Sequence, residues 1–139
     1  MDRVVWAKYL KQVEESEGFE IKDFPGECMM ITVFPMPFFL DKPENVVLLK
    51  DYAGRALKIY NEKYGTEWEV DNILKVNGGG CRNFIFYVTF SVKTSKGGKD
   101  IFQAMIEEDG KVEQGLEYNL EFPIIRPQPK KYSCLYAVV

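Results

Sequence analysis

The sequence predicts an α+β domain in which one long helix lies across a curved antiparallel sheet of four or five strands. Three observations predict this class. Apolar residues recur at helical spacing from about residue 43 to 64, they then recur at every second position in several short segments, and glycine-rich turns separate those segments. The expected order is β-α-β-β-β-β, with an added N-terminal helix. A chain of 139 residues is the size of one domain and can bury about two thirds of its unfolded surface.

The N-terminal segment has the pattern of a short amphipathic helix. Apolar residues recur at three- and four-residue spacing over 3–16, and Gly18 is suited to end the helix. Such a helix either packs on the edge of the domain or binds a partner, and both readings stay open. A strand is expected over 28–34, ended by Pro35 and Pro37, because proline cannot donate to a sheet ladder.

The long helix is expected to begin after Asp41, whose side chain can cap it, with Pro43 in the first turn and Gly65 at the end. One side of this helix is apolar. The residues on that side are Val46, Leu49, Ala53, Ala56, Leu57 and Tyr60.

Four further strands follow, each with one strongly apolar face, which is typical of an antiparallel meander covered on one side. The residues expected to point inward are Trp68, Val70, Leu74 and Val76; Phe84, Phe86, Val88, Phe90 and Val92; Phe102, Ala104 and Ile106; and Leu116, Tyr118, Leu120, Phe122 and Ile124. Turns are expected at 78–83, 95–98 and 109–110. Pro123 favours an edge position for the last strand.

The composition excludes several classes of function. A net charge of −3 gives no electrostatic reason to expect nucleic acid or an anionic membrane as a partner, and no apolar run approaches the roughly 20 residues of a membrane span. The chain has no histidine, so sites built on imidazole are ruled out. Cys28, Cys81 and Cys134 are widely spaced and odd in number, and the chain does not open on a secretory signal. We therefore expect a cytoplasmic or nuclear protein.

The remaining polar motifs fit ordinary surface roles better than sites. The glycines at 78–80 lack the Lys-Ser/Thr of a phosphate loop, and Cys81 fits an ordinary loop cysteine better than a reactive one. The acidic run 107–109 fits a solvated turn better than a cation site. The lysines at 93, 96 and 99 fit charged residues that protect a strand edge from pairing with another chain. The inward residues are apolar, which favours a solid core over a pocketed NTF2-like cone. We expect no catalysis, no metal and no cofactor.

The helix and the strands after it also carry a family pattern. The helix contains the pattern Tyr52-Ala53-x-x-Ala56-Leu57-x-x-Tyr60-Asn61. Three further runs match the same family without an alignment gap between residues 52 and 90: Trp68-Glu69-Val70, Ile73-Leu74-Lys75 and Phe86-Tyr87-Val88-Thr89-Phe90. This order resembles the cystatin family of cysteine-protease inhibitors, and more narrowly the plant cystatins. The segment 6–19 resembles the leader of an uncharacterised crucifer family of cystatin/monellin-like proteins. The resemblance covers about half of the chain and implies the cystatin fold.

The resemblance ends at the parts that inhibit proteases. Inhibitory cystatins insert a wedge made of an N-terminal glycine, a Gln-x-Val-x-Gly loop and a second-loop tryptophan. The resemblance places the first loop at 79–83, where no residue of the motif is kept, and the second near 112–115, which has no tryptophan. Arg82 and Asn83 stand where apolar atoms would fill the protease cleft, and both are costly to desolvate. Gly26 is the candidate for the N-terminal glycine.

The sequence therefore predicts a non-catalytic module that binds another protein. The expected contact residues come from the loop 78–83, the segment 24–26 and the outer sheet face: Gly26, Gly79, Gly80, Cys81, Arg82, Asn83 and Tyr87, with Ile85 beside them. Two alternatives stay open, namely a papain-like protease inhibitor with a non-standard wedge and a protein that self-associates as a homodimer. The expected organisation is a helical extension over 1–22, a cystatin-like domain over 23–126 and a tail over 127–139.

Overall fold

The computed structural model describes residues 3–22, 33–80, 83–111 and 118–129. Its elements in chain order are α1 (Arg3–Ser16), β1 (Val33–Pro35), the 3₁₀ turn η1 (Phe39–Asp41), α2 (Pro43–Tyr64), β2 (Glu69–Gly79), β3 (Phe84–Lys93), β4 (Lys99–Lys111) and β5 (Tyr118–Pro127). This order confirms the predicted α+β class. Several predicted features lie outside the described residues: Gly26, the strand over 28–32, Cys81, Arg82, the second loop at 112–115 and the tail beyond 129.

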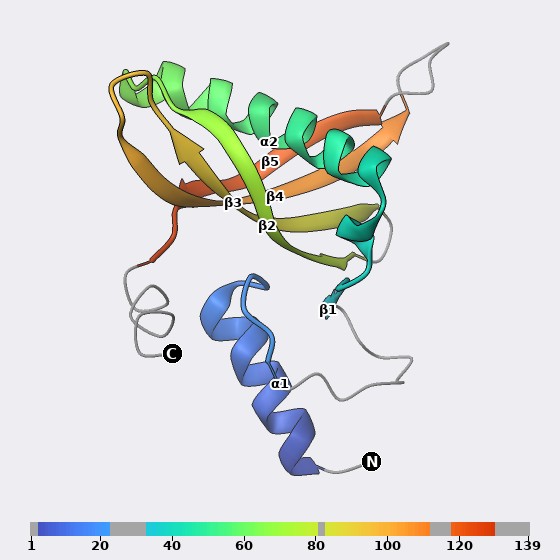
Figure 1. The fold of residues 1–139 in the computed structure, drawn as a ribbon. Helices are drawn as coiled ribbons and strands as arrows, with labels where there is room; N and C mark the ends of the chain where they lie inside the picture. Colours follow the sequence, from blue (N-terminus) through green and yellow to red (C-terminus); the bar gives the residue numbers. More distant parts are fainter. Residues whose placement is uncertain (1–2, 23–32, 81–82, 112–117, 130–139) are drawn as a thin grey trace.

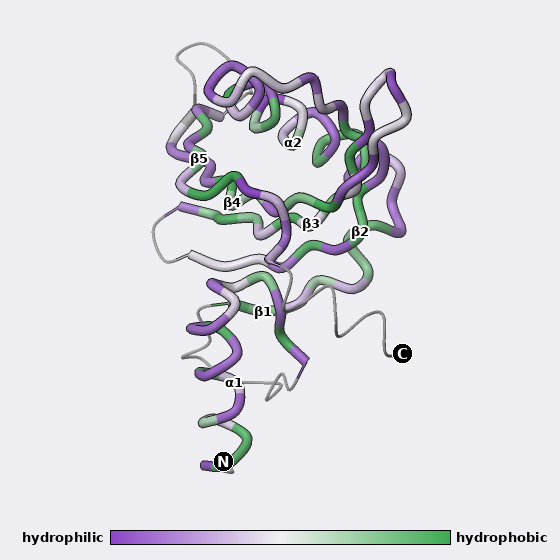
Figure 2. The backbone as a smooth tube through the Cα atoms, turned by 90° about the vertical axis from the view of Figure 1, so that its left-hand side faces the viewer, coloured by the Kyte–Doolittle hydropathy of each residue, from purple (hydrophilic) through white to green (hydrophobic). Residues whose placement is uncertain are grey.

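The strands form one antiparallel sheet in the order β1-β2-β3-β4-β5. It is a meander into which α2 is inserted between the first two strands (Figure 1). Helix α2 lies across one face of the sheet, whereas α1 lies beneath the opposite face (Figure 2). This is the arrangement expected of a cystatin-like layout with an added N-terminal helix. β5 is an edge strand, as its proline indicated.

The two ends of α2 differ in how well the sequence predicted them. Gly65 ends the helix with a φ of 67° and donates its N–H to the Asn61 carbonyl at 2.8 Å, as expected. Asp41 does not cap the start, because it already belongs to η1, where its N–H bonds the Phe38 carbonyl. Lys42 takes the cap position without a side-chain hydrogen bond, and Pro43 follows in the first turn.

The space between α2 and the sheet is filled by a solid apolar core. Its buried members are Leu49, Tyr52, Ala53, Ala56, Leu57, Val76, Phe86, Val88, Phe90, Val92, Phe102, Ala104 and Ile106. The inward positions predicted for β3 and β4 are thereby confirmed, apart from Phe84, which is partly exposed. Each large apolar side chain buried here stabilises the fold by about 1.5–3 kcal/mol, so this core fixes the helix on the sheet.

The predicted inward face of β2 was wrong at one position. Ile73 packs against the core, whereas Leu74 is 49% exposed. The reason lies in two irregularities of the pairing with β3, each of which inserts one extra residue into β2. Val70, Ile73 and Val76 therefore face the core at three-residue spacing instead of two.

The glycines at 78 and 79 do not form a turn, contrary to expectation. Both lie in β2, paired with β1 on one side and β3 on the other. A Cβ at Gly78 would lie 2.7 Å from the ring of Phe84 and 2.9 Å from the sulfur of Met36. Glycine here permits close packing, and because β2 continues to Gly79, only residues 80–83 separate it from β3.

The residues 109–110 also extend a strand instead of turning the chain. They belong to β4, and Gly110 adopts a φ of 74° where the pairing with β5 is irregular. A further irregularity in β5 sends Ile124 to the outer face and Ile125 to the core. The hairpin at 95–98 is confirmed, because the Thr94 N–H bonds the Gly98 carbonyl at 2.9 Å.

Candidate functional site

Several chain segments converge at one end of the sheet (Figure 1). β1 begins opposite Gly79, β3 begins directly after the turn at 80–83, and β4 ends where β5 begins. The predicted loop and the start of β1 therefore lie together. We call the described part of this region, residues 79–80, 83–84, 107–110 and 118–121, the sheet end.

The turn at the sheet end is built around Gly80. This residue has a φ of 101°, and a Cβ on it would lie 2.1 Å from the carbonyl oxygen of Asn83. Only glycine fits a backbone of this shape. Gly80 is exposed, whereas Gly79 is buried between Val33 and Ile85. The expectation that Gly79 offers a contact surface is therefore corrected.

Asn83 organises an acidic group on the outer side of the sheet end. Its Nδ2 donates to Glu107 Oε1 at 3.0 Å and to Asp109 Oδ1 at 3.3 Å. Glu121 stands directly opposite Glu107 in the sheet. A hydrogen bond with Asp109 raises the pKa of Glu121, and the charges of Asp109 and Glu107 act in the same direction. Among the described residues, no cluster is arranged to hold a metal ion.

Aromatic side chains occupy the inner side of the sheet end. The ring of Phe84 is 37% exposed and lies edge-on to Phe34 and Phe86, with centroids 6.4 Å and 4.7 Å away. Tyr52 of α2 donates its hydroxyl to Glu108 Oε2 at 2.7 Å, and burial raises the pKa of this hydroxyl.

Sequence reasoning did not select Phe84 or Glu108 as site residues, because alternation assigned the first to the core and a turn contained the second. The signal that would have found them is their cross-strand register, which places the two directly opposite each other. That register follows from the hairpin at 95–98, but the turn expected at 109–110 assigned Glu108 to a loop border instead of to a strand paired with Phe84.

Tyr87 does not offer an exposed contact, and this part of the predicted site is corrected. Its side chain is only 8% exposed because residues 17–21 cover it. Phe19 is fully buried against it, edge to face, with ring centroids 5.8 Å apart. We call residues 17–21 the docking segment. It continues α1 and attaches the N-terminal region to the outer face of the sheet.

Polar contacts fix the docking segment to two strands, β2 and β5, and helix α1 to a third, β1. Asn77 donates to the carbonyls of Gly18 and Phe19, and the carboxylates of Glu17 and Glu20 pair with Arg126 and Lys75. The Tyr9 hydroxyl of α1 bonds both backbone groups of Val33. Of the two readings of the N-terminal helix, packing on the domain is what the structure shows.

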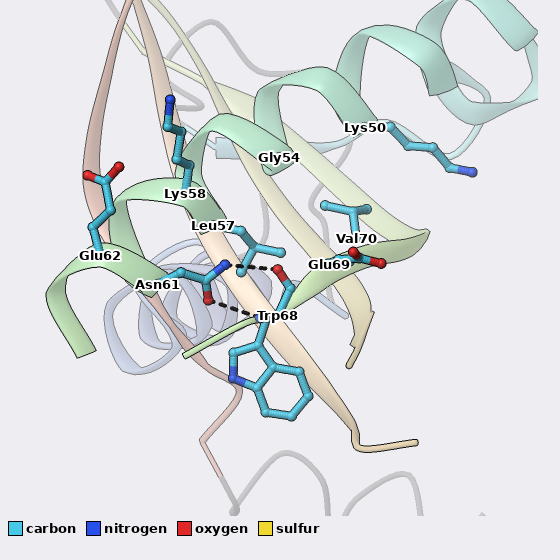
Figure 3. Close-up of a pocket in the computed structure, with 9 residues that line it drawn as sticks. All are labelled: Lys50, Gly54, Leu57, Lys58, Asn61, Glu62, Trp68, Glu69 and Val70. Atoms are coloured by element: carbon cyan, nitrogen blue, oxygen red, sulfur yellow. Dashed lines mark hydrogen bonds between the residues drawn. The ribbon is translucent and has the colours of Figure 1, made fainter. Parts of the chain in front are cut away.

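A groove of about 550 Å³ runs between α2 and β2 (Figure 3). Its lining residues are Lys50, Gly54, Leu57, Lys58, Asn61, Glu62, Trp68, Glu69 and Val70. Asn61 belongs to the helix pattern that resembles the plant cystatins, and here it joins the two walls. Its Oδ1 accepts from the Trp68 N–H and the Thr66 hydroxyl, and its Nδ2 donates to the Trp68 carbonyl. This amide is committed to Thr66 and Trp68, and the side chains of Lys50 and Lys58 point apart, so the polar groups of the groove do not converge.

Two surfaces therefore stand out in the described chain: the sheet end, and the outer face under the docking segment. No model of a known protein family matches the chain, and no curated protein matches its sequence. Neither described helix combines the length and the apolar character needed to cross a membrane.

Proposed function

We propose that this chain is a non-catalytic, cystatin-like module that recognises another protein through the sheet end, in the cytoplasm or nucleus. One observation carries the proposal: the sheet end joins an exposed glycine turn, an acidic group and a half-exposed phenylalanine in one place. The cystatin-like assignment is supported by the layout of the fold and by the helix pattern that ends in Asn61.

The chemistry of the sheet end favours a partner with basic and apolar groups. A hydrogen bond with Asp109 and the negative charges of Asp109 and Glu107 raise the pKa of Glu121, and a cation of the partner would stabilise its charged form beside them. Phe84 offers an aromatic ring of the kind that is enriched in protein interfaces. One partner would thus contact the glycine turn, the acidic group and the Phe84 ring at the same time.

A binding comparison with matched variants tests this proposal. The chain is used as bait alongside Asn83→Ala/Phe84→Ala at the sheet end and Lys96→Ala in the hairpin at the opposite end. A protein retained by the wild type and by the hairpin variant, but lost by the sheet-end variant, would support recognition there. Equal retention by all three folded baits would remove the sheet end from that role.

One observation favours a second candidate, an inhibitor of papain-like proteases. The fold brings the start of β1 and the turn after β2 to the same end as the β4–β5 connection, and these are the segments that form the wedge in the inhibitory family. Titrating papain with the purified chain separates the candidates. Sub-micromolar inhibition would favour the inhibitor, and full residual activity would favour the non-inhibitory module.

A further inference from the structure

We propose that the outer face of the sheet is a second recognition site, for a segment of a partner protein in which glycine and phenylalanine stand between two acidic residues. Residues 17–20 of this chain have that sequence and occupy the site as an internal ligand. This site is separate from the sheet end, so it does not depend on the function proposed above.

The site is a row of side chains that crosses four strands in register. From β2 to β5 the row consists of Lys75, Thr89, Gln103 and Arg126. The neighbouring row on the same face consists of Asn77, Tyr87, Met105 and Ile124. Adjacent strands lie about 4.8 Å apart, so the backbones of Lys75 and Arg126 stand about 14 Å from each other. A segment that crosses the strands can therefore place one acid at each end.

The docking segment uses the row in this way. Glu20 pairs with Lys75 at 2.6 Å at one end, and Glu17 pairs with Arg126 at the other. Phe19 lies between them, against Tyr87 and with the Arg126 guanidinium 5.4 Å from its ring centroid. Charge complementarity and the aromatic contact together define the acidic–aromatic–acidic order.

Two contacts make the site specific for the glycine and for the backbone. Asn77 is 1% exposed, and its Nδ2 donates to the carbonyls of Gly18 and Phe19 at 2.8 Å and 3.2 Å. A buried amide committed to the main chain of another segment is a means of recognising that segment. A Cβ at Gly18 would lie 2.6 Å from the Tyr87 ring, so a larger residue there would clash.

The site also has hydrogen-bonding capacity that the docking segment leaves unused. Thr89 Oγ1 and Gln103 Nε2 are buried, and no hydrogen-bond partner for either occurs in the described chain. Both lie in the middle of the row, and Arg126 Nε already orients the Gln103 amide by donating to its Oε1 at 3.1 Å. Buried polar groups are nearly always paired in native structures. A partner segment that pairs these two groups would gain contacts that the internal ligand does not make.

A partner must still compete with a tethered segment. A tether gives the internal ligand a millimolar-range effective concentration, so the wild-type chain should bind a free peptide weakly. The docked state also holds Glu17 at a φ of 57°, in the left-handed region that non-glycine residues avoid, and release relieves that strain. The internal ligand is therefore exchangeable without any change in the α2 core.

The test uses a fluorescent peptide with the sequence of residues 15–22 and measures its anisotropy on titration with the full chain. In one variant, Phe19→Ala removes the internal anchor, and in a second, Glu17→Lys/Glu20→Lys repels the segment from the two cations. Both should bind the peptide about tenfold or more tighter than the wild type, because apparent affinity scales with the fraction of open sites. If Phe19→Ala does not fold, the charge variant carries the test.

Further variants decide whether the row of side chains from Lys75 to Arg126 is responsible for peptide binding. Adding Lys75→Glu to the Phe19→Ala chain should abolish binding, whereas adding Lys96→Glu, an equal charge change in the far hairpin, should not. A peptide with alanine in place of Phe19 should not bind. Adding the sheet-end substitution Asn83→Ala to the Phe19→Ala chain should leave peptide affinity unchanged, which keeps this proposal apart from the proposed function.

Three results would overturn the proposal. The first is equal peptide affinity for the wild type and both opened variants, and the second is binding that survives Lys75→Glu. The third is a wild-type dimer in light scattering that Phe19→Ala abolishes, since the internal ligand would then be exchanged between two copies of this chain instead of being replaced by a partner.

Discussion

The missing Cβ of Gly18 keeps the docking segment flat against the sheet. Its φ of 95° and the 2.6 Å approach to the Tyr87 ring both require glycine. We predict that Gly18→Ala detaches the docking segment while the α2 core stays folded, at a cost of about 1–3 kcal/mol to docking. Hydrogen exchange should then quicken over 9–22 but not in β3.

The matched control for this substitution is Gly97→Ala. Gly97 also has a positive φ, 89°, but a Cβ on it would meet no atom within 4 Å. Its substitution should cost only the backbone strain and should leave exchange over 9–22 unchanged. Similar exchange in both variants would show that Gly18 is not a packing requirement.

The amide of Asn61 holds the end of α2 to the start of β2 with three hydrogen bonds. We predict that Asn61→Ala lowers the free energy of unfolding by about 1–3 kcal/mol, because it leaves the Trp68 backbone groups unpaired in a half-buried place. Urea denaturation measures the loss. Glu62→Ala, the exposed neighbour on the same helix, should change stability by no more than about 0.5 kcal/mol, and an equal loss in both variants would contradict the role of Asn61.

At the scale of elements, periodicity was a reliable guide wherever the pairing is regular. Phe86, Val88 and Phe90 alternate without interruption along β3, and they point inward as predicted. The long helix was predictable for the same reason, since its apolar repeat and its closing Gly65 are local signals. The prediction failed at Leu74 and Ile124, where an extra residue shifts the face of the strand.

Bulges and docking cannot be read from such local patterns. Whether a strand contains a bulge depends on its pairing with the neighbouring strand. The docking contacts join residues that are far apart in the sequence, such as Phe19 and Tyr87. Tyr87 was therefore predicted to be exposed, because its own strand alternates correctly and the cover comes from elsewhere. Gly80 and Asn83, in contrast, were expected to belong to one loop, and they lie against each other.

The two irregularities in β2 give a direct test of the face assignment. We predict that Ile73→Asp destabilises the protein by about 3 kcal/mol or more, because it places a charge against the core. Leu74→Asp, one residue further along, should cost less than about 1 kcal/mol because that side chain is already half exposed. Thermal unfolding compares the two variants. A larger loss for Leu74→Asp than for Ile73→Asp would mean that Leu74 faces the core, as regular alternation along β2 predicts.

At the scale of the whole molecule, the sheet is covered on both faces by different means. Helix α2 covers one face with a large apolar core, while the docking segment covers the other with one phenylalanine, an asparagine and two ion pairs (Figure 2). Charge screening by salt weakens ion pairs but does not weaken apolar burial. The two covers should therefore respond differently to solution conditions, and the outer cover should be the first to open.

The pH dependence of overall stability should report the acidic sheet end. A hydrogen bond with Asp109 and the charges of Asp109 and Glu107 raise the pKa of Glu121, so the folded state binds this proton more tightly than the unfolded state. The contribution of Glu121 to the stability of the fold is therefore most favourable below the ordinary carboxyl pKa, and it is lost as pH rises through the raised pKa. At neutral pH the charged Glu121 opposes folding. We predict that Glu121→Gln has a higher melting temperature than the wild type at pH 7, and that the gap closes as pH falls to about 4.

Thermal unfolding between pH 4 and pH 8 measures that gap, with Glu67→Gln as the control. Glu67 is an exposed glutamate outside the sheet end, so its variant shows how far the loss of one surface carboxylate alone changes the melting temperature. The comparison also bears on recognition, because a partner that places a cation beside Glu107 and Asp109 would remove the same repulsion. A difference in melting temperature that stays constant across this pH range would mean that Asp109 and Glu107 do not act on the charge of Glu121. The sheet end would then have no electrostatic reason to select a basic partner.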